Sequence, residues 1–210
     1  MSEFENRHVL VTGASSGIGL ATAQLLARRG ARVYLIARRE RQLAAATEAI
    51  ARTGGTAAYA VADVADRAAL LGAIDAAEEV FGSVAGLFAN AGAGGRFAPL
   101  TDYDDELFDS VLRTNLMSVY WAIKRVLPAM GARRGGSIVV TGSLASERGM
   151  PNNVAYVSSK HAVLGLARAA AIEAAPRNVR INCVLPGLIE TPMLMQLDPS
   201  ASVEALRERL

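Results

Sequence analysis

Cysteine and histidine are scarce in this chain of 210 residues, and their scarcity excludes two classes of site. The single cysteine, Cys183, excludes an internal disulfide. It lies in a strand-like run, residues 179–184, which indicates a small buried residue rather than a nucleophile. One cysteine and two histidines, His8 and His161, cannot assemble a Cys/His metal site, so we expect no metal.

Long apolar runs and an excess of one charge are also missing. No uncharged apolar run reaches the roughly 20 residues that a membrane-spanning helix needs. The acidic N-terminus, residues 1–6, lacks the apolar core of a secretory signal. The net charge is only +2, and scattered basic residues disfavour nucleic-acid binding. We therefore expect a cytoplasmic protein that acts on a small molecule and binds neither membranes nor nucleic acids.

Short runs rich in β-branched residues alternate with longer Ala- and Leu-rich periods, which predicts alternating strands and helices. The predicted strands are 9–11, 32–37, 57–61, 84–89, 137–141 and 179–185, and the predicted helices are 18–29, 40–52, 67–81, 104–130 and 154–175. Gly30 is suited to end the first helix, and Thr101 with Asp104 has capping-box spacing. Long helices between strands favour right-handed crossovers. The expected fold class is α/β, a doubly wound parallel sheet (Rossmann fold) in three layers, forming a single domain over residues 1–210.

A glycine-rich segment, residues 12–19 (TGASSGIG), joins the first predicted strand to the first helix. Its glycines, Gly13, Gly17 and Gly19, let the backbone turn sharply and approach a pyrophosphate at the helix N-terminus. The spacing is G-x-x-x-G-x-G rather than G-x-G-x-x-G, so a simple glycine-rich turn remains the alternative on this motif alone.

Two arginines, Arg38 and Arg39, follow the second predicted strand, and no acidic residue occurs before Glu40. An acid there would bind the ribose 2′-hydroxyl of NAD, whereas an arginine accommodates the 2′-phosphate of NADP. The sequence therefore favours NADP(H), with Arg38 against the 2′-phosphate, and leaves NAD(H) possible. A solvated arginine pair at a helix entry is the alternative.

Four polar residues form a candidate catalytic set. Tyr156 and Lys160 are four residues apart on a predicted helix and share a face. A nearby ammonium lowers the pKa of a phenol from about 10, which makes it an acid or base near neutrality. Ser143 follows the fifth strand, at the edge where ligands bind in open α/β sheets. Asn115 lies inside a predicted helix, where asparagine is unfavourable. Each has an ordinary alternative as a packed, turn or solvated residue.

Taken in order, these motifs resemble the short-chain dehydrogenase/reductase family over nearly the whole chain. Residues 12–19 match the family's TGxxxGxG loop, residues 90–92 its NAG motif and residues 186–191 its PG-x-x-x-T segment. The acidic pair that holds the adenine is matched by residues 63–64. The resemblance implies a cofactor site of Gly13, Ser15, Ser16, Gly17, Ile18, Gly19, Arg38, Asp63, Val64, Asn90, Ala91, Gly92, Tyr156, Lys160, Pro186, Gly187, Ile189 and Thr191.

The resemblance also implies an oxidoreductase that moves a hydride between NAD(P)(H) and a ketone or secondary alcohol. Tyr156 would donate the proton in reduction and accept it in oxidation. Lys160 would lower the pKa of Tyr156 and bind the nicotinamide ribose. Ser143 would polarise the substrate oxygen, and Asn115 would hold a water that links Lys160 to solvent.

The expected substrate pocket is mostly apolar. We expect it to be lined by Ala93, Gly94, Phe97, Ala145, Met150, Asn152, Leu188 and residues 193–197. This composition predicts a medium-sized, largely uncharged substrate, and Arg96 and Arg148 are expected to be solvated rather than to recognise an acid.

Two other functions stay open. The first is a regulator that binds the cofactor without turnover. It is disfavoured because such a protein has no need of an intact Ser143, Tyr156 and Lys160. A sugar-nucleotide epimerase or dehydratase of the extended branch is disfavoured by the glycine spacing and the short chain. Turnover of NADPH with a panel of ketones would separate the first of these from the main hypothesis.

The predicted helices 104–130 and 154–175 resemble those through which family members pair. The second contains small residues that permit close helix approach, namely Ala155, Ala162, Gly165, Ala169 and Ala170. Family members usually continue with a further helix and a seventh strand, and residues 192–210 are expected to form a substrate lid. We therefore expect a homodimer for the chain as written, and a homotetramer if a longer tail exists.

Overall fold

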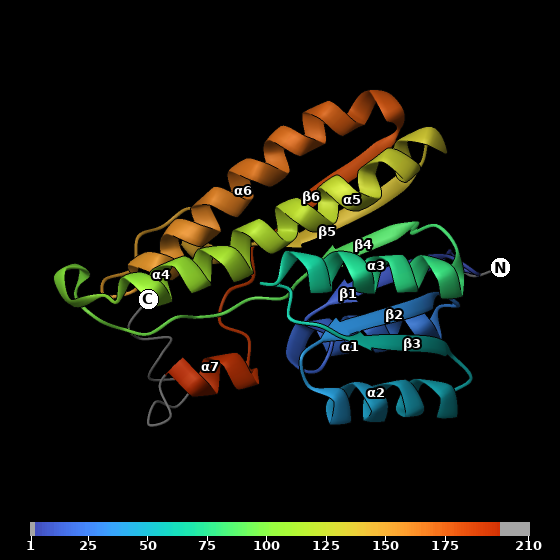
Figure 1. The fold of residues 1–210 in the computed structure, drawn as a ribbon, viewed down its shortest axis with the longest axis horizontal. Coiled ribbons are helices and arrows are strands. Elements are labelled where there is room, and N and C mark those ends of the chain that lie inside the picture. Colours follow the sequence, from blue (N-terminus) through green and yellow to red (C-terminus); the bar gives the residue numbers. More distant parts are fainter. Residues whose placement is uncertain (1–2, 198–210) are drawn as a thin grey trace.

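A computed structural model describes residues 3–197 of the chain (Figure 1). Its six strands form one sheet in the order β3-β2-β1-β4-β5-β6, and every neighbouring pair is parallel. The strands are β1 (His8–Thr12), β2 (Arg32–Ala37), β3 (Thr56–Val61), β4 (Gly86–Ala89), β5 (Gly136–Thr141) and β6 (Val179–Val184). The order reverses between β1 and β4, and in open α/β sheets ligands bind outside the carboxyl ends of the strands at such a point.

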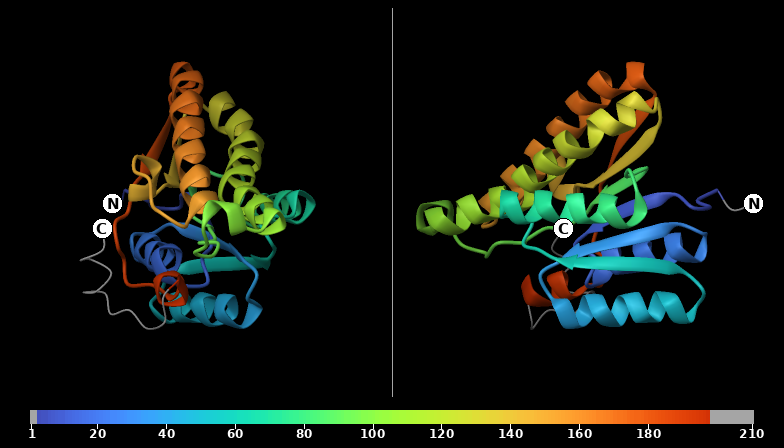
Figure 2. Two further views of the ribbon diagram at one scale, coloured as in Figure 1. Left: turned by 90° about the vertical axis from the view of Figure 1, so that its left-hand side faces the viewer. Right: turned by 45° about the vertical axis from the view of Figure 1, so that its right-hand side comes forward.

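Helices cover both faces of the sheet (Figure 2). The helices are α1 (Gly17–Arg28), α2 (Glu40–Arg52), α3 (Arg67–Phe81), α4 (Asp105–Leu112), α5 (Ser118–Ala132), α6 (Val154–Ala174) and α7 (Pro192–Leu197). One apolar cluster joins α1 and α2 to the sheet, and a second joins α3, α5 and α6 to its other face. All five residues of β1 are buried, as expected for a central parallel strand. The predicted three-layer Rossmann fold is confirmed.

Most predicted elements agree with the structure to within two residues at each end, and two details differ. The predicted helix 104–130 is interrupted by a π turn, Arg113–Met117, between α4 and α5. The capping box is wrong, because Thr101 lies in a short 3-10 helix and Asp104 is itself the N-cap. The Asp104 carboxylate accepts a hydrogen bond from the Leu107 amide at 2.7 Å.

The last strand, β6, pairs only with β5 within residues 3–197. Cys183 on β6 is half-buried rather than fully buried as expected, because this strand lies at the edge of the sheet that the described residues form. Residues 198–210 of the expected lid lie outside the described residues. No helix of the described part is long and apolar enough to cross a membrane.

Candidate active site

The carboxyl ends of β1, β4 and β5 are held together by side chains. The Thr12 hydroxyl accepts hydrogen bonds from the Asn90 and Ala91 amides at 3.0 and 3.1 Å. The Asn90 side chain donates to the Thr12 carbonyl at 3.2 Å and accepts from the Thr141 hydroxyl at 3.2 Å. The glycine loop and the segment Asn90–Gly92 are thus fixed against each other. The sequence analysis did not foresee the contribution of Thr141.

The glycine loop needs its glycines. Gly13 and Gly17 have φ angles of +67° and +55°, which non-glycine residues rarely adopt. A Cβ on Gly13 would lie 2.8 Å from the Ala91 Cα, and one on Gly19 would lie 2.5 Å from the Gly13 carbonyl oxygen. The loop leads directly into α1, whose N-cap Ser16 makes no side-chain capping bond. This close-packed turn at a helix N-terminus fits the pyrophosphate of a dinucleotide.

Two arginines flank this loop. Arg39 donates hydrogen bonds from Nη2 to the Ser15 and Ser16 hydroxyls at 2.9 and 2.7 Å. Arg38 forms an exposed ion pair with Asp63, in which Nη1 and Oδ2 are 3.7 Å apart. Sequence reasoning placed only Arg38 at the cofactor and missed the position of Arg39, because no sequence pattern shows which of two adjacent arginines faces the loop. Val64, also predicted to contact the cofactor, is buried in the core.

The residues of the predicted catalytic set lie around the end of β5. Lys160 on α6 is buried, and its Nζ donates to the Thr141 carbonyl at 2.7 Å. The same Nζ lies 5.6 Å from the centre of the Tyr156 ring. Ser143 follows β5 and caps a short 3-10 helix, Leu144–Ser146. A phenol, an ammonium and a hydroxyl therefore face one region, next to the glycine loop.

Burial controls the ionisation of these groups. Burial raises the pKa of Tyr156, and a hydrogen bond with the Ser143 side chain lowers it in part. The net shift is therefore upward, whereas the sequence analysis expected Lys160 to lower it. Burial lowers the pKa of Lys160 to about 8, while the neighbouring Cys183 raises it slightly. Within residues 3–197, no group of three His, Cys, Asp or Glu side chains could hold a metal.

Asn115 lies in the π turn with its side chain fully enclosed. Its Oδ1 accepts from the Ala93 amide at 2.7 Å. Its Nδ2 donates to the Ala93 carbonyl and to the Ser159 hydroxyl, both at 2.9 Å. Both amide protons therefore have acceptors within the protein. Sequence reasoning identified Asn115 but missed Ser159.

The predicted segment after β6 passes over the site. The Thr191 methyl group lies 3.1 Å from where a Cβ on Gly17 would be, and the Met193 methyl lies 3.8 Å from the same position on Gly92. The Leu144 amide donates to the Pro186 carbonyl at 3.1 Å, which joins this segment to the turn after Ser143. The structure thus brings the C-terminal part of the predicted cofactor site onto the glycine loop.

Comparison with known proteins identifies the family. The short chain dehydrogenase family profile matches residues 7–202. The chain belongs to this family. Levodione reductase of Leifsonia aquatica is 37% identical over 99% of this chain and 80% of that protein. A crystal structure of levodione reductase has a TM-score of 0.93 and covers 98% of this chain and 82% of that chain.

Two cofactor-bound structures of other proteins also resemble this short-chain dehydrogenase. A xylitol dehydrogenase with NAD+ is 38% identical, with a TM-score of 0.85 over 88% of this chain and 71% of that chain. A variant of the actinorhodin polyketide ketoreductase with NADPH is 34% identical, with a TM-score of 0.90 over 98% and 82%. Both nicotinamide cofactors therefore occur among similar structures.

Proposed function

We propose that this short-chain dehydrogenase interconverts a ketone and a secondary alcohol with NADP(H) in preference to NAD(H). The observation that carries the proposal is the meeting of Ser143, Tyr156 and Lys160 at the end of β5, beside the glycine loop. A cofactor-binding regulator would have no use for this set of groups. Bound nicotinamide would supply or take the hydride.

We assign each catalytic side chain a role that its position supports. Ser143 holds the substrate oxygen by donating a hydrogen bond, and Tyr156 gives that oxygen its proton during reduction. In oxidation Tyr156 accepts the proton back. Lys160 supplies positive charge behind the phenol and a donor for the nicotinamide ribose. A buried phenol with a raised pKa is rarely ionised near neutral pH, so this positive charge is needed to stabilise its ionised form.

The preference for NADP(H) is supported by the charges around the glycine loop. Arg38 and Arg39 provide guanidinium groups that can make charge-assisted hydrogen bonds to phosphate oxygens. Ala37, which ends β2, has no side chain to accept a bond from the 2′-hydroxyl of NAD. We assign the 2′-phosphate to Arg38, whose distant pairing with Asp63 leaves it free to turn.

The substrate side is apolar, which supports a medium-sized uncharged ketone. Leu144 and Ile189 are 43% and 45% exposed, and Phe97 is 48% exposed on the loop that follows β4. Arg96 is exposed and donates to the Asp102 carbonyl at 2.8 Å, which supports a solvated role for it. Levodione reductase and a polyketide ketoreductase, two of the similar proteins, are named for the reduction of carbonyl compounds.

Removal of the Tyr156 hydroxyl tests this function. Tyr156→Phe keeps the ring and removes the acidic proton, so NADPH-dependent reduction of a ketone panel should fall by ~10²–10⁴-fold, the usual value of general acid–base catalysis. Binding of NADPH, followed by fluorescence, should change little. Tyr59→Phe on β3 is the matched control and should retain full activity. Near-normal turnover by Tyr156→Phe would refute the mechanism, and NADPH binding without turnover by the unmodified protein would favour the regulator.

A further inference from the structure

Ser159, one residue before Lys160, is fully buried and connects two parts of the active site. Its hydroxyl accepts a hydrogen bond from Asn115 Nδ2 at 2.9 Å and donates one to the Tyr156 carbonyl at 2.7 Å. Asn115 in turn binds both backbone groups of Ala93, at 2.7 and 2.9 Å. We define this continuous chain of hydrogen bonds, from Ala93 through Asn115 and Ser159 to Tyr156, as the Asn115 clamp.

The Asn115 clamp joins three segments that are distant in sequence. Ala93 lies in the loop after β4, Asn115 in the π turn, and Ser159 on α6 beside the catalytic residues. The clamp is also adjacent to the lysine amine. A Cβ on Gly92 would lie 3.4 Å from Asn115 Oδ1 and 3.8 Å from Lys160 Nζ. A change in the clamp would therefore alter the positions of Tyr156 and Lys160.

The hydroxyl of Ser159 differs from that of an ordinary buried serine in a helix. Such a serine satisfies itself by donating to a carbonyl one turn earlier, and no other element depends on it. Ser159 makes that bond and also accepts the second proton of the Asn115 amide. Without the hydroxyl, this proton would be enclosed with no acceptor, which costs more than the hydrogen bond itself contributes.

We propose that Ser159 is a positioning residue for the reaction. It fixes the first turns of α6 against the π turn, so that the Tyr156 phenol stays aligned with Ser143 and with the Lys160 ammonium. Ser159 does not touch the reacting atoms, and its effect passes through Asn115 and the backbone of Tyr156. This inference rests on the proposed function.

The direct test is Ser159→Ala in the full chain, with Ser158→Ala as the matched control. Ser158 is the preceding residue of the same helix, is only partly buried, and makes no side-chain hydrogen bond within residues 3–197. For Ser159→Ala we expect kcat to fall about tenfold, which corresponds to about 1.4 kcal/mol. The dissociation constant of NADPH should stay within about twofold, a change of less than about half a kcal/mol. Ser158→Ala should match the unmodified protein in both.

The pH profile separates positioning from a purely structural role. If the phenol loses its alignment with Ser143 and Lys160, the apparent pKa that governs kcat should rise in Ser159→Ala and stay in place in Ser158→Ala. Ser159→Cys, which is slightly larger and keeps a weak donor and acceptor, should recover part of both kcat and the profile. A loss of kcat that only follows the folded fraction, with an unchanged profile, would overturn the proposal.

A double-mutant cycle tests the connection to Asn115. If the two residues act as one unit, Asn115→Ala with Ser159→Ala should be no slower than Asn115→Ala alone. If the double variant instead lost kcat by the product of the two single-variant losses, the two residues would act independently and the clamp would be contradicted.

Amide hydrogen exchange gives a readout that needs no substrate. The Ala93 amide bonds to Asn115 Oδ1, so its exchange should accelerate in Ser159→Ala and not in Ser158→Ala. If the unmodified protein turns over no ketone, the proposed function fails, while accelerated exchange at Ala93 would still support the clamp. Equal exchange at Ala93 in both variants would overturn the clamp, whatever the activity.

Discussion

Burial disfavours the charged form of the Lys160 amine. Its amine is enclosed, and within residues 3–197 it makes one hydrogen bond, to the Thr141 carbonyl. Because burial lowers the pKa of Lys160 to about 8, the amine is partly neutral in mildly alkaline solution. A dinucleotide brings phosphates and ribose hydroxyls that favour the charged form.

We therefore predict that cofactor binding takes up a proton at Lys160 when the pH lies above about 8. Below this pH the amine is already charged, so uptake should vanish and affinity should be highest. Affinity should fall as the pH rises through the pKa. Calorimetric titration of NADPH in two buffers of different ionisation enthalpy measures the uptake on either side of this pH. Lys160→Met should abolish it, and uptake that persists in that variant would assign the proton to another group.

A second prediction at this scale concerns Arg38 and Arg39. If Arg38 binds the 2′-phosphate, Arg38→Ala should weaken NADPH about tenfold or more and leave NADH nearly unchanged, as expected for loss of a charge-assisted contact. Arg39→Ala removes the hydrogen bonds to the Ser15 and Ser16 hydroxyls, so it should weaken the binding of both cofactors to a similar degree. Arg41→Ala, an exposed arginine on α2, is the control. A selective NADPH loss in Arg39→Ala alone would transfer the 2′-phosphate to that residue.

Sequence alone was sufficient to bring together residues whose spacing matches the period of a helix. Tyr156 and Lys160 are one helical turn apart, so a shared face follows from the period of the helix. Ser159 belongs to the same helix, yet its partner Asn115 is 44 residues away. A pairing of this kind depends on how two helices cross, which local pattern does not contain.

At the scale of elements, the interruption of the predicted helix 104–130 has a similar explanation. The π turn Arg113–Met117 keeps helical backbone angles at both ends, and its residues have no composition that marks an extra residue per turn. Asn115 was a residue whose type conflicted with a helix interior. Its side chain bonds to Ala93 outside the helix, which accounts for that conflict.

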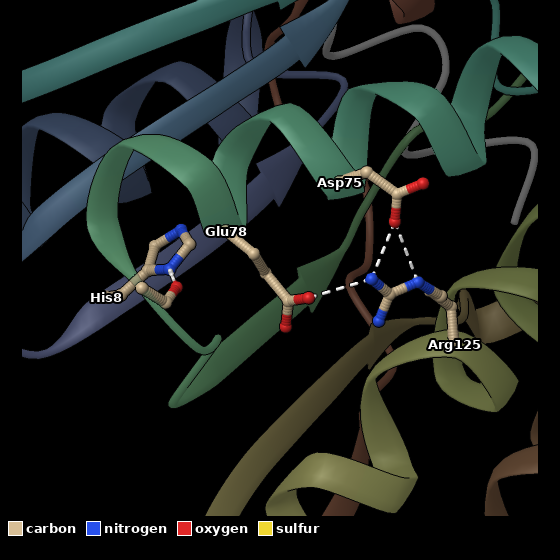
Figure 3. A network of polar contacts seen from close by, with 5 residues as sticks. His8, Asp75, Glu78 and Arg125 are labelled. Carbon is tan, nitrogen blue, oxygen red and sulfur yellow. Dashed lines mark hydrogen bonds and ion pairs between the residues drawn. The ribbon is translucent and has the colours of Figure 1, made fainter.

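The junction between β1 and the end of α3 contains a buried histidine (Figure 3). His8 Nδ1 lies 2.6 Å from the Gly82 carbonyl, and the ring packs edge-on against Phe81. Its Nε2 is enclosed with no partner in the described part of the chain. Burial is the largest effect and lowers the pKa of His8, and the hydrogen bond with the Gly82 carbonyl offsets part of this shift. The charges of Arg32 and Arg133 lower the pKa further, and that of Glu78 raises it.

This environment predicts a loss of stability in acid. The pKa of His8 is lower in the folded than in the unfolded chain, where it is about 6.5. The unfolded chain therefore binds the proton first, and the free energy of unfolding should fall as the pH drops below about 6.5. Urea unfolding at several pH values measures this. His8→Gln should flatten the dependence, whereas His161→Gln, at an exposed position, should not.

The same region tests whether His8 alone is responsible. Arg125 on α5 bonds to Asp75 and Glu78 on α3, at 2.6 and 2.8 Å (Figure 3). Arg125→Met removes both ion pairs and serves as a second reference. If the dependence between pH 5 and 7 survives in His8→Gln and disappears in Arg125→Met, the ion pairs rather than the histidine control it.

At the scale of the whole molecule, alternation of strands and helices was enough to predict a doubly wound sheet. Right-handed crossovers and coverage of both faces follow from that alternation. Sequence alone did not show which helix surfaces stay exposed to solvent, because that depends on how the helices pack. Ala155, expected at a subunit interface, is fully buried within the subunit and cannot contribute. Ala162, Gly165 and Ala169 are exposed and lie near one another on α6, with Ile172 at 77% exposure.

This exposed strip leads to the last prediction, a homodimer paired through α5 and α6. Small residues let a second helix approach closely, and an exposed isoleucine beside them favours burial in a partner. Gly165→Arg is a sharp test, because a Cβ at Gly165 would meet no atom within 4 Å. The substitution should leave the fold intact, even favour the helix, and convert the dimer to a monomer. Gly72→Arg on α3, equally unobstructed, should remain dimeric. Light scattering on chains of verified mass decides the matter: a stable monomer of the unmodified chain, or a Gly165→Arg variant that stays dimeric, would rule out pairing through this face.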